Sequence, residues 1–169
     1  MFFKKKLSIE DAKNLVFYTF TTLETEGKSP VHRTVADLEP AFDHAVTLCA
    51  EYAMFLWGTT EGLHSAMVNP EVIDAIITGA LKHWYGVIAK PITQYGGDPD
   101  AMHDKVVALY NGLIDYRSDP HLQACLVLSS ALGQEHPKAT DYGACAHLVA
   151  QILGISKVTM EWAKSVRIS

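Results

Sequence analysis

DLEPAFDHAVTLCAEYAMFLW, residues Asp37 to Trp57, is the stretch that decides the fold. Apolar side chains recur in it at steps of three and four residues, which places them on one stripe of an α-helix: Leu38, Phe42, Ala45, Leu48, Cys49, Tyr52, Phe55 and Leu56. Polar side chains fall on the other side of that helix, where we expect water to reach them: Glu39, Asp43, Thr47 and Glu51. Because so broad a stripe needs several neighbours to cover it, the sequence predicts a bundle around a central helix 37–57.

Start and stop signals on either side of this stretch predict further helices. Ser8 and Asp11 form a capping-box pattern, and an acid or amide precedes proline at Asn69, Asp98 and Asp119. We expect glycine or proline to end helices, with 28–33 and 58–62 as connections. The predicted helices are therefore 8–24, 37–57, 69–90, 98–117, 121–132, 140–153 and one from 156 onward.

The predicted fold is an all-α bundle of about seven helices, forming a single domain over residues 1–169. The short helix 121–132 is apolar on nearly every side, so we expect it to be buried together with helix 37–57. Residues 1–7 are expected to form a flexible tail. No repeat, low-complexity tract or long linker divides the chain.

Composition narrows the range of functions. The chain has 49% hydrophobic and 20% charged residues, and a formal net charge of −5 with scattered basic residues. This balance disfavours nucleic-acid binding, which needs clustered Lys and Arg. The cysteines Cys49, Cys125 and Cys145 are few and widely spaced, and they favour reduced thiols in a cytoplasmic protein.

The first residues do not have the pattern of a signal peptide, since no apolar run follows Lys4–Lys6. Phe2, Phe3 and these lysines (residues 2–6) could make weak contact with an anionic membrane surface. The longest apolar run, Tyr52 to Trp57, is far shorter than the roughly twenty residues that span a bilayer. We therefore expect a soluble protein.

Two patterns are compatible with a metal site. Glu61 and His64 have the spacing by which one helical turn presents a carboxylate and an imidazole to one ion. His103-Asp104 resembles the paired metal ligands of the HD phosphohydrolase superfamily, an all-α class of metal-dependent hydrolases. The resemblance covers these two residues, and it implies a further upstream histidine, His64 or His83, and a downstream aspartate, Asp115 or Asp141.

A third pattern lies in the helix that begins at Asn69. Gly79, His83 and Gly86 are spaced by four and three residues, so they share one helix face. Since each glycine costs such a helix about 1 kcal/mol relative to alanine, something is expected to approach the backbone closely there. The default interpretation is a crossing helix; the alternative is a flat ligand that His83 binds.

No reaction follows from these patterns, so we expect binding rather than catalysis. The leading hypothesis is a non-enzymatic protein-interaction or regulatory module, acting as a homo-oligomer such as a homodimer or with another protein. Trp57, Trp84 and Trp162 are candidate contacts. The alternative is a small-ligand or metal-binding protein, such as a metal-dependent hydrolase, that uses His83 or His103 with Asp104. The sequence names no cofactor.

Overall fold

The computed structural model describes residues 4–25 and 29–168, and seven α-helices make up most of this part of the chain. The elements are β1 (Lys5–Leu7), α1 (Ile9–Thr25), α2 (Pro30–Leu38), α3 (His44–Ser65), α4 (Pro70–Trp84), the π-helical turn η1 (Tyr85–Ala89), the 3-10 helix η2 (Lys90–Tyr95), α5 (Pro99–Asp115), α6 (Pro120–Leu132), α7 (Tyr142–Ser165) and β2 (Val166–Ile168). The prediction of an all-α bundle is confirmed.

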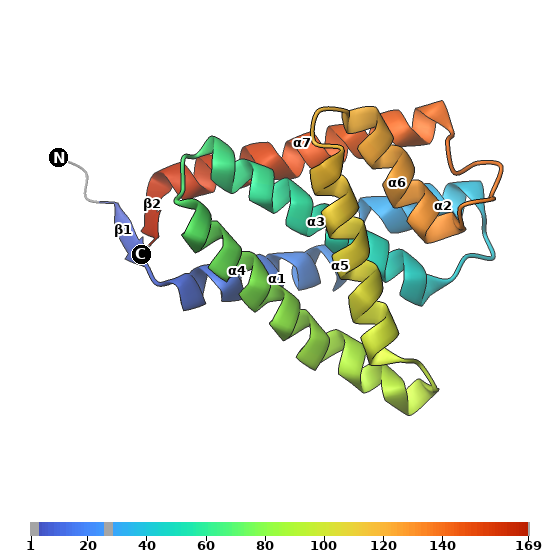
Figure 1. Cartoon of the computed structure of the whole chain (residues 1–169), viewed down its shortest axis with the longest axis horizontal. Helices are drawn as coiled ribbons and strands as arrows, with labels where there is room; N and C mark the ends of the chain where they lie inside the picture. The colour runs from blue at the N-terminus through green and yellow to red at the C-terminus, as the bar shows by residue number, and fades with distance from the viewer. Residues whose placement is uncertain (1–3, 26–28, 169) are drawn as a thin grey trace.

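Helix α3 is the centre of the bundle, because it packs against each of the other six α-helices (Figure 1). Twelve consecutive residues, 49–60, are buried in it. The helix begins later than predicted: Asp43 is its N-cap and accepts hydrogen bonds from the amides of Ala45 and Val46. Pro40 lies in the preceding loop rather than in a first helical turn.

The segment 28–33, predicted as a connection, contains the start of an additional helix, α2. Pro30 occupies its first turn, and Val31 and Val35 are completely buried. Since α2 packs against α3, it covers a side of that helix that we expected to face water. Thr47 and Glu51 are accordingly 0% and 3% exposed, and their predicted exposure was wrong.

Gly58 and Gly62 do not end the central helix but lie within it, facing α7. A Cβ atom on Gly62 would lie 2.5 Å from the carbonyl oxygen of Ser156, and one on Gly58 would lie 2.8 Å from Ile155 Cγ2. The two glycines therefore let the backbones of α3 and α7 approach each other. This contact stabilises the helical conformation by more than the glycines cost, so the predicted loop at 58–62 was wrong.

The two helices predicted at 140–153 and from 156 onward are one continuous helix, α7. Gly154 sits in its interior with ordinary helical geometry and does not stop it. The merged helix is, by length and composition alone, apolar enough to cross a membrane: 18 of its residues have a mean hydropathy of 1.2, and 22% of them are buried. In the bundle it packs along α3 and α6.

The predicted helix starts at Asn69, Asp98 and Asp119 are confirmed. Each side chain accepts a hydrogen bond from an amide of the first turn, and proline follows directly. Helix α6 ends at Leu132, with Gly133 at a φ of 99°. The helix from Asn69 does not end at Pro91 but continues through η1 into η2, with Pro91 in the first turn of the 3-10 segment.

An aromatic cluster joins α1, α3 and α4 at one end of the core. The ring of Tyr52 stacks on Trp84 at a centroid distance of 5.6 Å and meets Phe20 edge-on at 4.6 Å. Its buried hydroxyl donates a 2.9 Å hydrogen bond to the carbonyl oxygen of Ala80. Burial raises the pKa of Tyr52, so this proton stays in place at any ordinary pH.

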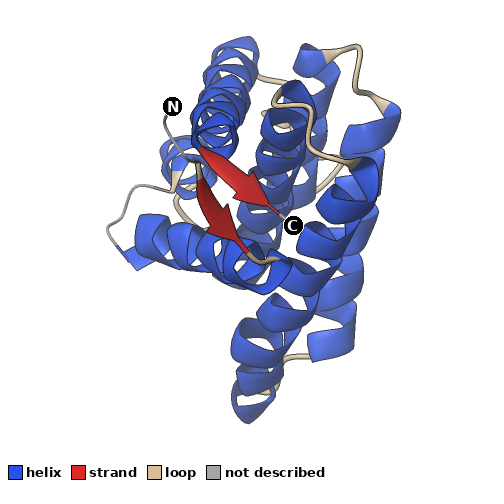
Figure 2. Ribbon diagram, turned by 90° about the vertical axis from the view of Figure 1, so that its left-hand side faces the viewer, coloured by secondary structure: helices blue, strands red, loops and turns tan. Residues whose placement is uncertain are grey.

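Residues 5–7, expected to belong to a flexible tail, form strand β1, which pairs in parallel with β2 (Figure 2). Lys6 pairs with Arg167 at the centre of this short ladder. The predicted membrane contact of Phe2 and Phe3 falls outside the described residues.

Candidate functional site

A pocket of about 510 Å³ lies between α1, α3 and α7. Its floor is Glu51, Phe55 and Thr59 of α3, which are spaced by four residues and so stand in one row along the helix. The walls come from α1 and α7, each with residues at helical spacing. They are Leu15, Val16, Thr19, Phe20, Leu23 and Glu24 on one side, and Gln151, Gly154, Ile155, Val158, Thr159 and Trp162 on the other, with Pro30 of α2 completing the lining.

The rim of this pocket is apolar and accessible, while its floor is deep. Leu15 is 43% exposed and Val158 66%, whereas each floor residue is buried. Of the three tryptophans named as candidate contacts, Trp57 and Trp84 are in the core, and Trp162 lines the pocket. The volume of about 510 Å³ falls within the range of pockets that bind small molecules in other proteins.

Three titratable side chains, Glu24, His32 and Glu51, converge at the end of the pocket nearest α2. His32 Nδ1 lies 4.0 Å from an oxygen of each carboxylate. Glu51 accepts hydrogen bonds from the backbone amides of Val31 at 2.7 Å and His32 at 3.3 Å, and Glu24 accepts one from the Ser29 hydroxyl. One ligand atom from each of the three lies within 4.8 Å of the others, close enough to hold a metal ion.

Burial controls the charges of this cluster. It raises the pKa of Glu51 to about 8, with a smaller contribution from the charge of Glu24, while the amides of Val31 and His32 oppose the rise. Burial also lowers the pKa of His32, and the Glu24 carboxylate opposes that change. At neutral pH, Glu51 is therefore largely protonated and His32 largely neutral.

Two buried polar atoms in this region have no hydrogen-bond partner within the described residues. They are the hydroxyl oxygen of Thr59, in the pocket floor, and Nδ1 of His32. Leaving a buried polar atom unpaired costs roughly 1–3 kcal/mol. Of the two, Thr59 lines the pocket, so a polar group entering the pocket could pair with its hydroxyl.

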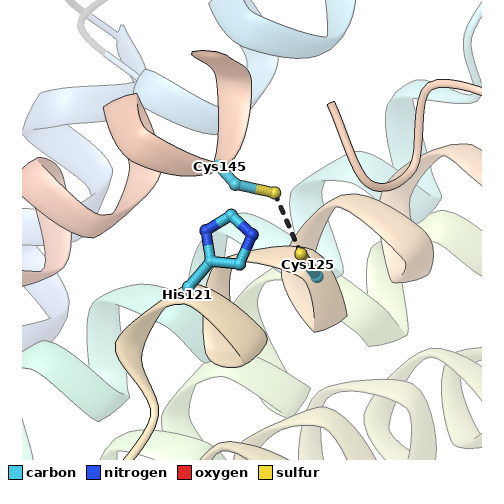
Figure 3. Close-up of side chains that lie close together, drawn as sticks. All are labelled: His121, Cys125 and Cys145. Carbon is cyan, nitrogen blue, oxygen red and sulfur yellow. Dashed lines mark hydrogen bonds between the residues drawn. The ribbon is translucent and has the colours of Figure 1, made fainter. Parts of the chain in front are cut away.

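A second cluster, His121, Cys125 and Cys145, lies where α6 meets the start of α7 (Figure 3). The Sγ atoms of Cys125 and Cys145 are 3.1 Å apart, and one ligand atom of His121 lies within 4.8 Å of both. Burial, followed by hydrogen bonding to Cys125, raises the pKa of Cys145 to about 12. Sequence reasoning treated the cysteines separately; the His-x-x-x-Cys spacing at 121–125 was the available signal.

The predicted glycine face of the helix from Asn69 is contacted by α1. A Cβ on Gly79 would meet the Lys13 side chain at 2.3 Å, and the ring of His83 stacks on Phe17 at 4.3 Å. Nothing lies within 4 Å of the corresponding position on Gly86. The close approach at Gly79 and His83 is thus a packing contact with a neighbouring helix.

Among residues 4–25 and 29–168, His64, His103 and Asp104 belong to no group of three or more potential metal ligands. Within the described residues, the two groups of three or more such side chains are the clusters above, and neither contains them, His83, Asp115 or Asp141. His103 packs edge-on against Tyr85 at 5.5 Å, and Asp104 is exposed. Glu61, one turn before His64, is in α3 rather than a loop and pairs with Arg117 at 3.0 Å.

Comparison with known proteins gave no family, no curated relative and no solved structure that matches this chain.

Proposed function

We propose that this chain binds a small amphipathic molecule in the pocket between α1, α3 and α7. The observation that carries the proposal is the contrast within one lining: two apolar helical walls lead to a floor that holds buried polar groups. An elongated apolar body would replace water along α1 and α7, where burial contributes roughly 25 cal/mol for each Å² removed from water.

The ionisable side chains in the lining, Glu24 and Glu51, both carry carboxyl groups, which favours a cationic head group. An ammonium ion there would donate hydrogen bonds to the oxygens of both carboxyl groups. Thr59 lies two helical turns from Glu51 along the floor, so its hydroxyl would face another part of the ligand. Since the pKa of Glu51 is about 8 in the free protein, an arriving cation would displace its proton. Binding should therefore release protons and strengthen as pH rises toward 8.

The test compares dodecylamine with dodecanol and dodecanoate, each below its critical micelle concentration, by calorimetry in two buffers of different ionisation enthalpy. The amine is expected to bind at least about tenfold more tightly than the other two and to release a proton. Similar affinities for all three would contradict the cationic head group, and no binding by any of them would contradict the pocket.

The matched variants are Gly154→Trp and Gly86→Trp. Both glycines are exposed helical positions with open space where a Cβ would lie, but Gly154 alone of the two lines the pocket. Gly154→Trp should weaken amine binding by at least about tenfold, and Gly86→Trp should leave it unchanged. Equal behaviour of the two variants would place the bound amine elsewhere.

A second candidate function is the binding of another protein, or of a second copy of this chain, at the rim of the same pocket. The exposed apolar side chains Leu15 and Val158, which are 43% and 66% exposed, favour it. Sedimentation equilibrium of the wild type and of Val158→Lys tests this. A wild type that self-associates and a variant that is monomeric would support docking, and a monomeric wild type would count against a homo-oligomer.

A further inference from the structure

The His121, Cys125 and Cys145 cluster is built from two helices that are joined by the segment 133–141 (Figure 3). His121 and Cys125 are four residues apart in α6, so their side chains lie on one face of its first two turns. Cys145 is in the first turn of α7 and points at the same space, with its Sγ 3.1 Å from that of Cys125. None of the three lines the pocket described above.

We infer that His121, Cys125 and Cys145 form a binding site for a thiophilic divalent metal ion, specifically Zn²⁺. One imidazole nitrogen and two sulfurs are a donor set that zinc prefers, and here they lie within 4.8 Å of one another. The ligand atoms of a tetrahedral zinc ion with such donors are about 3.5–3.8 Å apart. The two sulfurs, now 3.1 Å apart, need to separate by about 0.7 Å to reach that geometry.

The burial pattern matches a site that opens on one side. Cys125 and Cys145 are buried, while His121 is exposed and packs beside Tyr142 at a ring distance of 5.5 Å. Three protein ligands leave the fourth position of a tetrahedral ion free for water. The ion would join the start of α6 to the start of α7.

Zinc binds cysteine as the thiolate, so the site has a second readout in the release of the thiol protons. A divalent cation displaces these protons and leaves two thiolates whose charges it neutralises. Binding should therefore release about two protons per ion and should strengthen with rising pH.

The experiment titrates the full chain, kept reduced with a phosphine and stripped of metal, with Co²⁺ as a spectroscopic probe and with Zn²⁺ by calorimetry. We expect one ion per chain, a sulfur-to-cobalt charge-transfer band that Zn²⁺ abolishes by displacement, and a higher melting temperature with Zn²⁺. A chain that binds neither ion saturably, or that binds cobalt without that band, would overturn the inference.

Variants assign the ligands. Cys125→Ser and Cys145→Ser should each weaken Zn²⁺ binding at least about a hundredfold and reduce the thiolate band, and His121→Ala should weaken binding while keeping the band. Cys49→Ser is the control, because Cys49 is equally buried but lies in α3, with its Sγ 3.7 Å from the carbonyl oxygen of Met102. Circular dichroism of each variant verifies folding before titration.

Two further results would also count against the site. If Cys49→Ser were as damaging as the other two serine variants, zinc would be binding to thiols in a partly unfolded chain. If the reduced chain bound no ion but formed a Cys125–Cys145 disulfide on exposure to oxidised glutathione, the pair would be a redox couple instead. Neither result would bear on the amine-binding pocket, whose lining contains none of these residues.

Discussion

The carboxylate of Glu51 in α3 accepts a 2.7 Å hydrogen bond from the backbone amide of Val31, twenty residues earlier in the chain. Val31 is in the first turn of α2, whose own N-cap residue, Ser29, makes no side-chain capping bond. A side chain of the central helix therefore satisfies amides that a local cap would ordinarily satisfy. The same oxygen lies at the acidic end of the pocket, so a structural contact and the proposed ligand site share one residue.

Replacing Glu51 by glutamine should change how stability depends on pH. The pKa of Glu51 is about 8 in the folded state against 4.5 for the unperturbed group, so between these values the folded state holds a proton that the unfolded state has released. The stabilisation from that proton is complete below pH 4.5 and is lost as the pH rises through 8. Urea unfolding at several pH values should show wild-type stability falling over this range, and a flatter profile for Glu51→Gln. Parallel profiles would contradict the raised pKa.

Glu51→Ala provides the companion measurement. Glutamine retains an oxygen that can accept from Val31 and His32, whereas alanine leaves both amides without this acceptor. We expect alanine to lower the free energy of unfolding by about 1–2 kcal/mol relative to glutamine. If the two variants were equally stable, Glu51 would not be acting as the cap of α2.

Gly62→Ala should destabilise the protein, while Gly154→Ala should stabilise it. A methyl group on Gly62 would lie 2.5 Å from the Ser156 carbonyl oxygen, which is backbone and cannot turn away. The expected loss is about 1–3 kcal/mol. At Gly154 nothing lies within 4 Å, and alanine should add about 0.5–1 kcal/mol through helix propensity. Chemical denaturation measures both, and a Gly62→Ala variant as stable as wild type would contradict the close crossing of α3 and α7.

Tyr52→Phe isolates one buried hydrogen bond. The substitution keeps the stacking on Trp84 and removes the donor to the Ala80 carbonyl oxygen, so the free energy of unfolding should fall by about 1 kcal/mol. Tyr18→Phe is the control, since Tyr18 is 60% exposed and should lose almost nothing. Equal effects of the two changes would show that the Tyr52 hydroxyl adds no stability.

The pairing of β1 with β2 is open to hydrogen exchange. Backbone amides within Lys5–Leu7 should exchange more slowly in the wild type than in a chain that lacks residues 166–169, because the deletion removes their hydrogen-bonding partners. Amides of α5, which is remote from the ladder in sequence, serve as the internal reference. Identical exchange at residues 5–7 in both chains would mean that the strand does not persist in solution.

Sequence reasoning predicted best where a helix start depends on local chemistry. Ser8 and Asp11 form the predicted capping box, with Ser8 Oγ donating to Asp11 at 2.7 Å and accepting from its amide at 3.0 Å. The three proline-preceding caps were likewise correct, because a cap side chain bonds amides two or three residues away. Such signals need no knowledge of the rest of the fold.

Helix ends and exposure depended on tertiary contacts, and there the sequence misled. Gly58 and Gly62 are weak helix formers, yet they lie inside a helix because α7 packs on them. Residues 30–38 form α2 partly because the Glu51 side chain caps that helix. The sequence does not predict α2, so it also fails to predict that Glu51 is buried beneath it. One missed helix thus concealed the acidic end of the pocket.

The spacing of residues along the chain shows at most part of either candidate site, such as His121 and Cys125 of the metal-ligand cluster. The pocket joins residues of α1 and α7, at opposite ends of the sequence, and the metal-ligand cluster joins Cys125 to Cys145 across a helix boundary. Patterns confined to one helix, such as Gly79 and His83, turned out to mark packing against a neighbour. Local periodicity indicates which face of a helix is covered, but it does not indicate which other segment of the chain covers that face.

Where two helices touch through glycine, their backbones are in direct contact. A tilt or a slide of either helix would then produce a steric clash. Since α7 rests on α3 in this way, the floor of the pocket and its α7 wall form one stiff unit. Helix α1, which packs chiefly against α4, is the other wall. The motion that opens the pocket to a ligand should therefore be a movement of α1. A cross-link between α1 and its neighbouring helix would slow ligand entry without altering the shape of the cavity.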